Sequence, residues 1–309
     1  MHIRHFAIGI GLLAMTSGSA SACITLGRAS STIGVDQEKA IIIWNARTQT
    51  EHFIRQAQFR TDTHDFGFLV PTPSVPSLKA ADPNVFSTIE DKIFPRNRAT
   101  LSMSGAVAGA LPVGSQRIEI FSRQNVAGYE ATVLKAKDVG ALNTWLLKNG
   151  YQHGSSLNAW LKPYISQGWA ITAFKVKRTE GRLNGAKLSP VRMTFHTDTP
   201  FYPYREPAAA PEPGLSPAPR LLRVFYIWTG EAAGTLGHNA KWPARAIWSN
   251  TLTGISTGNT PLTGQIARKV GLRSSDIPKN AWLTVFDDHS SPRPATADLY
   301  FHSSATPTS

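Results

Sequence analysis

The chain has 309 residues, of which 41% are hydrophobic and 17% are charged, and its formal net charge is +12. This length suits one large domain or two ordinary ones, and the hydrophobic fraction excludes a disordered protein. The single cysteine excludes an intramolecular disulfide framework and any metal site built from several thiolates. The chain has 32 Lys and Arg against 20 Asp and Glu. Because its charged fraction of 17% is below the usual quarter, the positive charge comes mainly from a shortage of acidic residues.

The first 22 residues predict an export signal. Arg4 lies in a short basic start, and residues 6–15 form an apolar run that is too short to span a bilayer. Ala20 and Ala22 then give the small-x-small pattern that signal peptidases cleave. We therefore expect a signal peptide over residues 1–22 and a periplasmic or extracellular protein.

Cys23 would become the first residue after cleavage, which raises lipid attachment as an alternative. Lipoprotein signals usually place Leu three residues before the cysteine, where this sequence has Ala20. We therefore favour ordinary cleavage over a lipid anchor at Cys23. No later stretch reaches 18 apolar residues, so no transmembrane span is predicted in the mature chain.

The first elements of the mature chain are a predicted hairpin, a third strand and a helix. Residues 40–44 and 52–59 flank a turn-like segment, and the first of these runs is apolar on both faces. Residues 66–70 form the third strand, which we expect Pro71 to end because proline cannot donate to a ladder. Residues 83–94 place their apolar side chains at helical spacing.

The middle of the chain predicts a helical hairpin set among strands. Asp138 suits the cap of a helix that Gly150 ends, and a second apolar helix ends before Gly168. The two helices occupy residues 138–167. We expect strands on either side, over residues 117–121, 128–135, 169–176 and 191–195.

Residues 200–219 contain seven prolines and predict an extended, exposed connection. Beyond them, residues 221–229 form a strongly apolar strand, and residues 281–286 and 297–301 are closing strands. The stretch 230–265 is rich in Gly, Thr and Asn and resembles loop sequence. Its tryptophans are interpreted either as core anchors or as the lining of a carbohydrate or peptide groove.

These elements predict an α+β fold: a mainly antiparallel β-sheet with a helical hairpin packed on it. The expected organisation has five parts, in chain order: a signal peptide (1–22), an N-terminal α+β domain (23–199), a Pro-rich linker or long loop (200–220), a C-terminal β-rich part that belongs to the same fold or a second one (221–302), and a disordered tail (303–309).

Five stretches in this order resemble a bacterial family known only as domain of unknown function 2330. They are residues 66–73, 142–151, 168–176, 188–195 and 197–203. The resemblance extends over about residues 23 to 230. It implies an exported or envelope protein with no established activity and supplies no catalytic residue.

Ser256 lies in a G-x-S-x-G pattern, the spacing of a serine hydrolase nucleophile elbow. That chemistry needs a buried strand before the serine and a helix after it, whereas the flanking residues here are polar. His289 and Asp288 would be the partners of a catalytic triad. The alternative is a Gly- and Ser-rich loop that matches the pattern by chance.

Two acid and histidine clusters are candidate metal ligands, because carboxylate and imidazole suit divalent metals. The candidates are His64 with Asp65, and His289 after two aspartates. The alternative is that these side chains bond their own backbone in strand-ending turns. No ligand spacing typical of a metal site is present, so we predict no metal and no cofactor.

An exported protein rarely meets nucleic acid, so we expect no nucleic-acid partner despite the charge. The excess instead favours contact with anionic envelope lipid, a wall polymer or an acidic protein. The candidate contacts are the densest basic groups: Lys175, Lys177, Arg178, Arg220 and Arg223. We favour a non-catalytic envelope or periplasmic binding module, with an exported hydrolase as the alternative and a structural envelope scaffold as the third hypothesis.

Overall fold

The structure is a computed structural model. It describes residues 25–26, 33–61, 65–94, 117–151, 153, 156–177, 186–187, 189–206, 220–290, 293 and 297–304. The predicted signal peptide, Cys23 and most of the Pro-rich segment therefore lie outside the described residues, as do residues 305–309 of the predicted tail. Within the described part no helix is long and apolar enough to cross a membrane.

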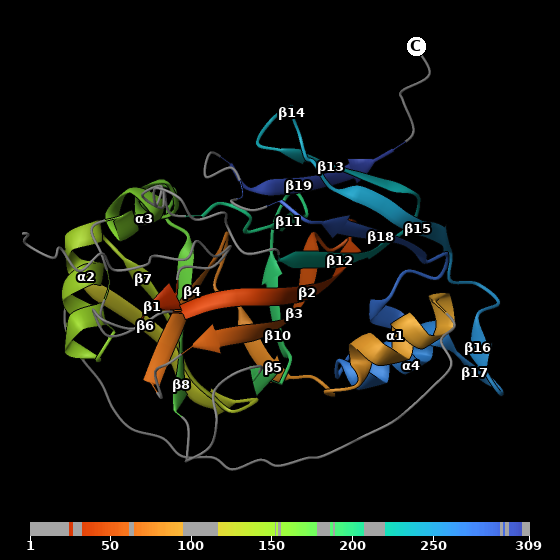
Figure 1. Ribbon diagram of the computed structural model, residues 1–309, viewed down its shortest axis with the longest axis horizontal. Helices are drawn as coiled ribbons and strands as arrows, with labels where there is room; N and C mark the ends of the chain where they lie inside the picture. The colour runs from red at the N-terminus through yellow and green to blue at the C-terminus, as the bar shows by residue number, and fades with distance from the viewer. Residues whose placement is uncertain are drawn as a thin grey trace, which may run out of the picture.

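An eight-stranded sheet forms the centre of the molecule (Figure 1). Its strands, in spatial order, are β15 (Arg245–Thr251), β18 (Trp282–Asp288), β12 (Leu221–Trp228), β2 (Ile33–Asn45), β3 (Thr50–Thr61), β10 (Val191–His196) and β5 (Ser77–Ala80), with β9 (Ala186–Lys187) also paired to β3. All neighbours are antiparallel except β12 and β2, which run parallel. The predicted α+β class with a mainly antiparallel sheet is confirmed.

The predicted hairpin of β2 and β3 is confirmed, with Ile42 opposite Phe53. The apolar character of both faces of β2 has a direct cause, because both faces of this central strand are covered. Ile42 belongs to the core shared with the other sheets, whereas Ile41 and Ile43 face a second core beneath two helices. Alternate side chains point to opposite sides of a strand, so a doubly covered strand must be apolar throughout.

A five-stranded sheet carries the predicted helical hairpin (Figure 1). Its strands are β1 (Thr25–Leu26), β4 (Asp65–Thr72), β8 (Ala170–Lys177), β7 (Tyr129–Ala136) and β6 (Ile118–Val126). Helices α2 (Val139–Lys148) and α3 (Ser156–Ser166) pack on one face through a core that includes Leu146 and Trp160. Asp138 caps α2 as predicted, since its carboxylate accepts the N–H of Ala141 at 2.7 Å.

Two further helices cover the face of the eight-stranded sheet that bears Ile41 and Ile43 (Figure 1). Helix α1 (Val85–Ile93) lies where residues 83–94 predict it. Helix α4 (Leu262–Lys269) begins inside the stretch 230–265, which resembles loop sequence. The difference arises because Pro261 and Gly264 resemble loop sequence, whereas Leu262 and Ile266 are fully buried and anchor the first turns.

A small four-stranded sheet completes the core beside Tyr226 of β12. It contains β11 (Phe201–Tyr202), β19 (Leu299–Ser303), β13 (Ala232–Leu236) and β14 (Ala240–Lys241). Phe301 of β19 stacks on Tyr226, with ring centroids 4.5 Å apart. Strands β13, β14 and β15 thus occupy much of the stretch 230–265. The stretch resembles loop sequence because edge strands such as β15 bury few apolar side chains.

Two expectations about proline are wrong. Strand β4 continues through Pro71, which pairs with Ile171 of β8. The Pro-rich segment is not exposed from its start, because residues 201–202 form β11 and the rings of Tyr202 and Tyr204 are fully buried. Aromatic residues between the prolines supply the apolar area that composition alone conceals.

The strands before and after the Pro-rich segment belong to one sheet. β12 of the C-terminal part lies between β2 of the N-terminal part and β18. Glu206 and Arg220, the described residues that flank the undescribed stretch 207–219, form a buried ion pair. The two ends of that stretch therefore meet inside the fold.

Candidate functional site

Ser256 lies in a small exposed hairpin rather than at a nucleophile elbow. Strands β16 (Ser256–Thr257) and β17 (Thr260–Pro261) pair with each other, and Ser256 is exposed. Gly254 and Gly258 have φ angles of +85° and +55°, the left-handed region that favours glycine. The two glycines of the pattern therefore serve turns, and no buried strand precedes the serine. His289 is exposed just after β18.

Asp288, the second candidate partner of Ser256, is already engaged by several donors. Its carboxylate accepts hydrogen bonds from the Tyr204 hydroxyl at 2.6 Å, the Trp242 indole N–H at 3.0 Å and the Ser290 N–H at 2.8 Å. Burial raises the pKa of Asp288, but the bonds from Tyr204 and Ser290 outweigh it and hold the pKa below its ordinary value. Asp288 thus anchors a turn and two rings. Trp242 is a core residue.

Only some of the candidate metal ligands lie among the described residues. His64 lies outside the described residues, and only the backbone of Asp65 is described, in β4. Asp287 is occupied by Arg223, whose guanidinium donates to both carboxylate oxygens at 2.7 Å. Among the described residues no group of three His, Cys, Asp or Glu could hold a metal ion.

Two of the five predicted anionic contacts are wrong because they are used inside the protein. Arg220 is buried against Glu206, and the half-buried Arg223 pairs with Glu90 and Asp287. A guanidinium held in this way cannot face a membrane or polymer.

The other three contacts lie in or after β8. The Nζ of Lys175 donates to the Asn149 carbonyl at 3.1 Å and lies 5.6 Å from the centre of the Tyr151 ring. Arg178 and the side chain of Lys177 lie outside the described residues. The described part of this basic group thus supports the end of α2 rather than an open surface.

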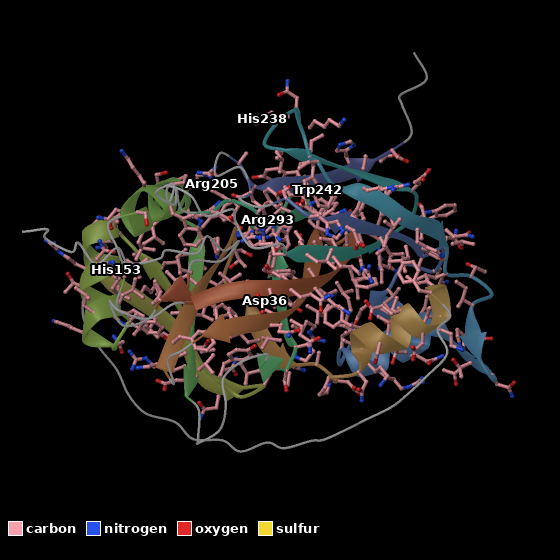
Figure 2. All side chains as sticks on the ribbon, viewed as in Figure 1. Asp36, His153, Arg205, His238, Trp242 and Arg293 are labelled. Atoms are coloured by element: carbon pink, nitrogen blue, oxygen red, sulfur yellow. The ribbon has the colours of Figure 1, made fainter. Side chains whose placement is uncertain are left out.

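A buried group of charged residues joins the two halves of the chain, and we call it the Arg293 cluster. Its members are three arginines and three carboxylates: Glu38, Arg55, Glu206, Arg220, Asp288 and Arg293. Each is more than nine-tenths buried. Figure 2 shows Arg293 in the interior of the molecule, near Trp242. The formal charges cancel, which is the condition for burying so many ions.

Two hydrogen-bonded ion pairs account for four members of the Arg293 cluster. The Nε of Arg55 donates to Glu38 at 2.6 Å, and Arg220 donates to Glu206. Burial raises the pKa of Glu38, but Arg55 and Arg293 outweigh it and lower that pKa. Burial, followed by the charge of Arg293, lowers the pKa of Arg220 to about 10, so Arg220 remains charged at neutral pH.

The excess positive charge of the described residues lies on the surface. Their buried charged residues are six carboxylates and four arginines, so the interior has no cationic excess. Their exposed charged residues are eleven Lys and Arg against five Asp and Glu. The basic composition is therefore a property of the outside of the molecule.

A group of cations lies at and after the end of α4: Arg268 and Lys269 end the helix, and Arg273 and Lys279 follow it. We call these four residues the basic segment. Lys269 is tied to Asp82 at 2.9 Å, and Arg273 pairs with Asp276 while remaining 85% exposed. Arg268 and Lys279 are exposed. A depression of about 300 Å³ lies beside the segment, lined by Asp82, Gln265, Arg268 and Lys269.

Sequence reasoning missed this basic segment because the cations are separated by apolar and polar residues. A usable signal was present: Leu262, Ile266 and Val270 share one helical face, which directs Arg268 away from it. The helix then ends and the following residues form a short turn, so the next cations are also exposed.

The family model described as an uncharacterized protein conserved in bacteria (DUF2330) matches residues 17–221, roughly two thirds of the chain. The chain belongs to this family. The predicted resemblance is thereby confirmed. The DUF2330 match ends at the first residue of β12, so the basic segment lies beyond it.

None of the curated proteins matches this DUF2330 chain. Among solved structures, the crystal structure of baculovirus P35 is similar with 10% sequence identity and a TM-score of 0.41. The similarity covers 90% of this chain and 96% of that one.

Proposed function

We propose that this DUF2330 protein is an exported bacterial protein that binds phosphate-bearing anionic lipid of the envelope without catalysing a reaction. The observation that carries the proposal is the distribution of charge. The interior has six carboxylates against four arginines and so no cationic excess, whereas exposed cations outnumber exposed acids eleven to five among the described residues. Such a surface is attracted to anionic material over about a Debye length.

The export signal expected in residues 1–22 supports this choice of partner. An exported protein meets the anionic lipid of the envelope, and each Lys or Arg near such a surface contributes about 1 kcal/mol. Arg268 and Lys269 of the basic segment line a depression of about 300 Å³ together with Gln265 and with Asp82, the partner of Lys269. We therefore assign the contact to the end of α4.

Co-sedimentation with vesicles tests the proposal. The mature protein should bind vesicles of phosphatidylglycerol and phosphatidylcholine at low salt, and phosphatidylcholine alone only weakly. Binding should fall steeply as NaCl rises from about 10 mM to about 300 mM, because the Debye length shortens from about 30 Å to less than about 8 Å over that range. Binding that ignores salt or lipid charge would reject the proposal.

A pair of charge-matched variants assigns the surface. The triple variant R268Q/R273Q/K279Q should lower the partition coefficient roughly a hundredfold, from about 1 kcal/mol for each charge removed. The control K137Q/K148Q/K162Q removes three exposed cations in and beside the helical hairpin of α2 and α3, which lies away from α4 (Figure 1), and should retain most of the binding. Equal losses in both variants would show a diffuse charge effect and contradict the assignment to α4.

A further inference from the structure

Arg293 occupies an unusual position in the cluster that bears its name. Its Nη1 lies 3.8 Å from Glu38 and 3.7 Å from Glu206, and its Nε lies 3.9 Å from Asp288. All of these side chains are 1% exposed or less. The guanidinium therefore lies among three carboxylates that come from β2, from the segment after β11 and from the end of β18.

The contacts that Nε and Nη1 of Arg293 make with the three carboxylates are electrostatic rather than hydrogen-bonded. Its Nε and Nη1 make no hydrogen bond to the described protein atoms, and neither does one oxygen each of Glu38 and Glu206. The separations of 3.7–3.9 Å exceed hydrogen-bond length. Each carboxylate instead has a closer donor of its own, which for Asp288 is the hydroxyl of Tyr204. Glu38, Glu206 and Asp288 are therefore each held by a hydrogen-bond donor other than Arg293.

The charge and shape of this enclosure suit one guanidinium. Without Arg293, the two other arginines leave the three carboxylates with a net charge of −1. The Tyr204 ring lies 5.4 Å from the guanidinium carbon of Arg293, within the range of a cation–π contact. A ring face favours a flat, weakly hydrated guanidinium over a strongly hydrated ammonium or metal ion.

We propose that Glu38, Glu206, Asp288 and the ring of Tyr204 form a guanidinium-binding cage that Arg293 of the same chain fills. The ligand class of the cage is therefore the guanidinium group, and Arg293 joins carboxylates from both halves of the chain. This inference is independent of the proposed lipid binding, because every residue of the cage is buried.

Chemical rescue tests the cage. Arg293→Ala should lower the thermal midpoint by about 5–10 °C, because it leaves a buried negative charge without its partner. Methylguanidinium at about 10 mM should restore much of that loss, increasing with the logarithm of its concentration. Denaturation by guanidinium salts needs molar concentrations, so this amount does not itself unfold the protein. Methylammonium at the same concentration should restore little.

Controls separate the cage from general ionic effects. The wild type and Arg245→Ala, which removes an exposed arginine, should gain nothing from methylguanidinium. Arg293→Lys keeps the charge but loses the planar fork and should remain less stable than the wild type. A midpoint for Arg293→Lys equal to that of the wild type would overturn the proposal, as would equal rescue by methylammonium.

A variant that does not fold on its own still tests the cage. Arg293→Ala refolded in methylguanidinium but not in methylammonium supports the cage. Two outcomes would show that the proposal is wrong. The variant stays unfolded in both salts, or it is stably folded when neither salt is present.

Discussion

Replacing Glu51 by glutamine should make the protein less sensitive to rising pH. Glu51 lies on β3 and is fully buried. One carboxylate oxygen accepts the Phe201 N–H at 2.9 Å, and the other makes no hydrogen bond to the described protein atoms. Burial raises the pKa of Glu51 well above its ordinary value of 4.5, although the Phe201 bond opposes the shift. Glutamine has the same shape and keeps the acceptor.

The size of the effect follows from proton linkage. At pH values between 4.5 and the raised native pKa, the folded protein holds one proton that the unfolded chain has lost. The stability contributed by Glu51 is therefore complete below pH 4.5 and is lost as the pH rises through the native pKa. The free energy of unfolding falls by about 1.4 kcal/mol per pH unit in that window. For a protein of this size this corresponds to about 3–5 °C per unit.

The assay is the thermal midpoint of the wild type and of Glu51→Gln, measured in parallel from acidic to slightly alkaline pH. The difference between the two curves cancels every other titrating group. The thermal midpoint of Glu51→Gln should rise relative to that of the wild type by about 3–5 °C for each pH unit above 4.5, up to the native pKa. Glu231→Gln removes an exposed carboxylate and serves as the control. A difference curve for Glu51→Gln as flat as that of the control would refute the reasoning.

Three further outcomes follow from the interior. Burial lowers the pKa of His52 from 6.5 to about 4, so the stability that neutral His52 contributes is complete above pH 6.5 and is lost as the pH falls. The free energy of unfolding, measured by denaturant titration at pH 7 and at pH 4, should therefore differ by about 3 kcal/mol less in His52→Gln than in the wild type. Gly67→Ala would place a methyl carbon 2.6 Å from a buried tyrosine ring and should cost more than 2 kcal/mol, whereas Gly128→Ala meets no neighbour and should cost about 1 kcal/mol; equal costs would contradict this. Glu206→Gln and Arg220→Met should each cost about 3–5 kcal/mol, and the double variant less than their sum; additive costs would show that the pair is not coupled.

Local sequence signals predicted the elements whose structure depends on neighbouring residues. Asp138 caps α2 as expected, because a cap needs only the next turn of its helix. The unbroken apolar run of Ile41, Ile42 and Ile43 indicated a strand covered on both faces. These features require no knowledge of distant parts of the chain.

Features that depend on distant partners could not be predicted in this way. Arg223 looked like a surface cation until the fold placed Asp287 beside it, 64 residues away. Asp288 looked like a free acid, but Tyr204 and Trp242 reach it from other segments. The sign and number of charges are readable from sequence, whereas their pairing is a property of the tertiary structure.

Site-directed labelling tests the lipid-binding surface most directly. In a Cys23→Ser background, an environment-sensitive dye at Ser275→Cys reports on the basic segment, and a dye at Ala159→Cys reports on the exposed face of α3. On adding phosphatidylglycerol vesicles at low salt, we predict a blue-shifted and brighter emission from the dye at position 275 and no change at position 159. Unchanged emission at 275, or a response at 159 alone, would contradict binding through the end of α4.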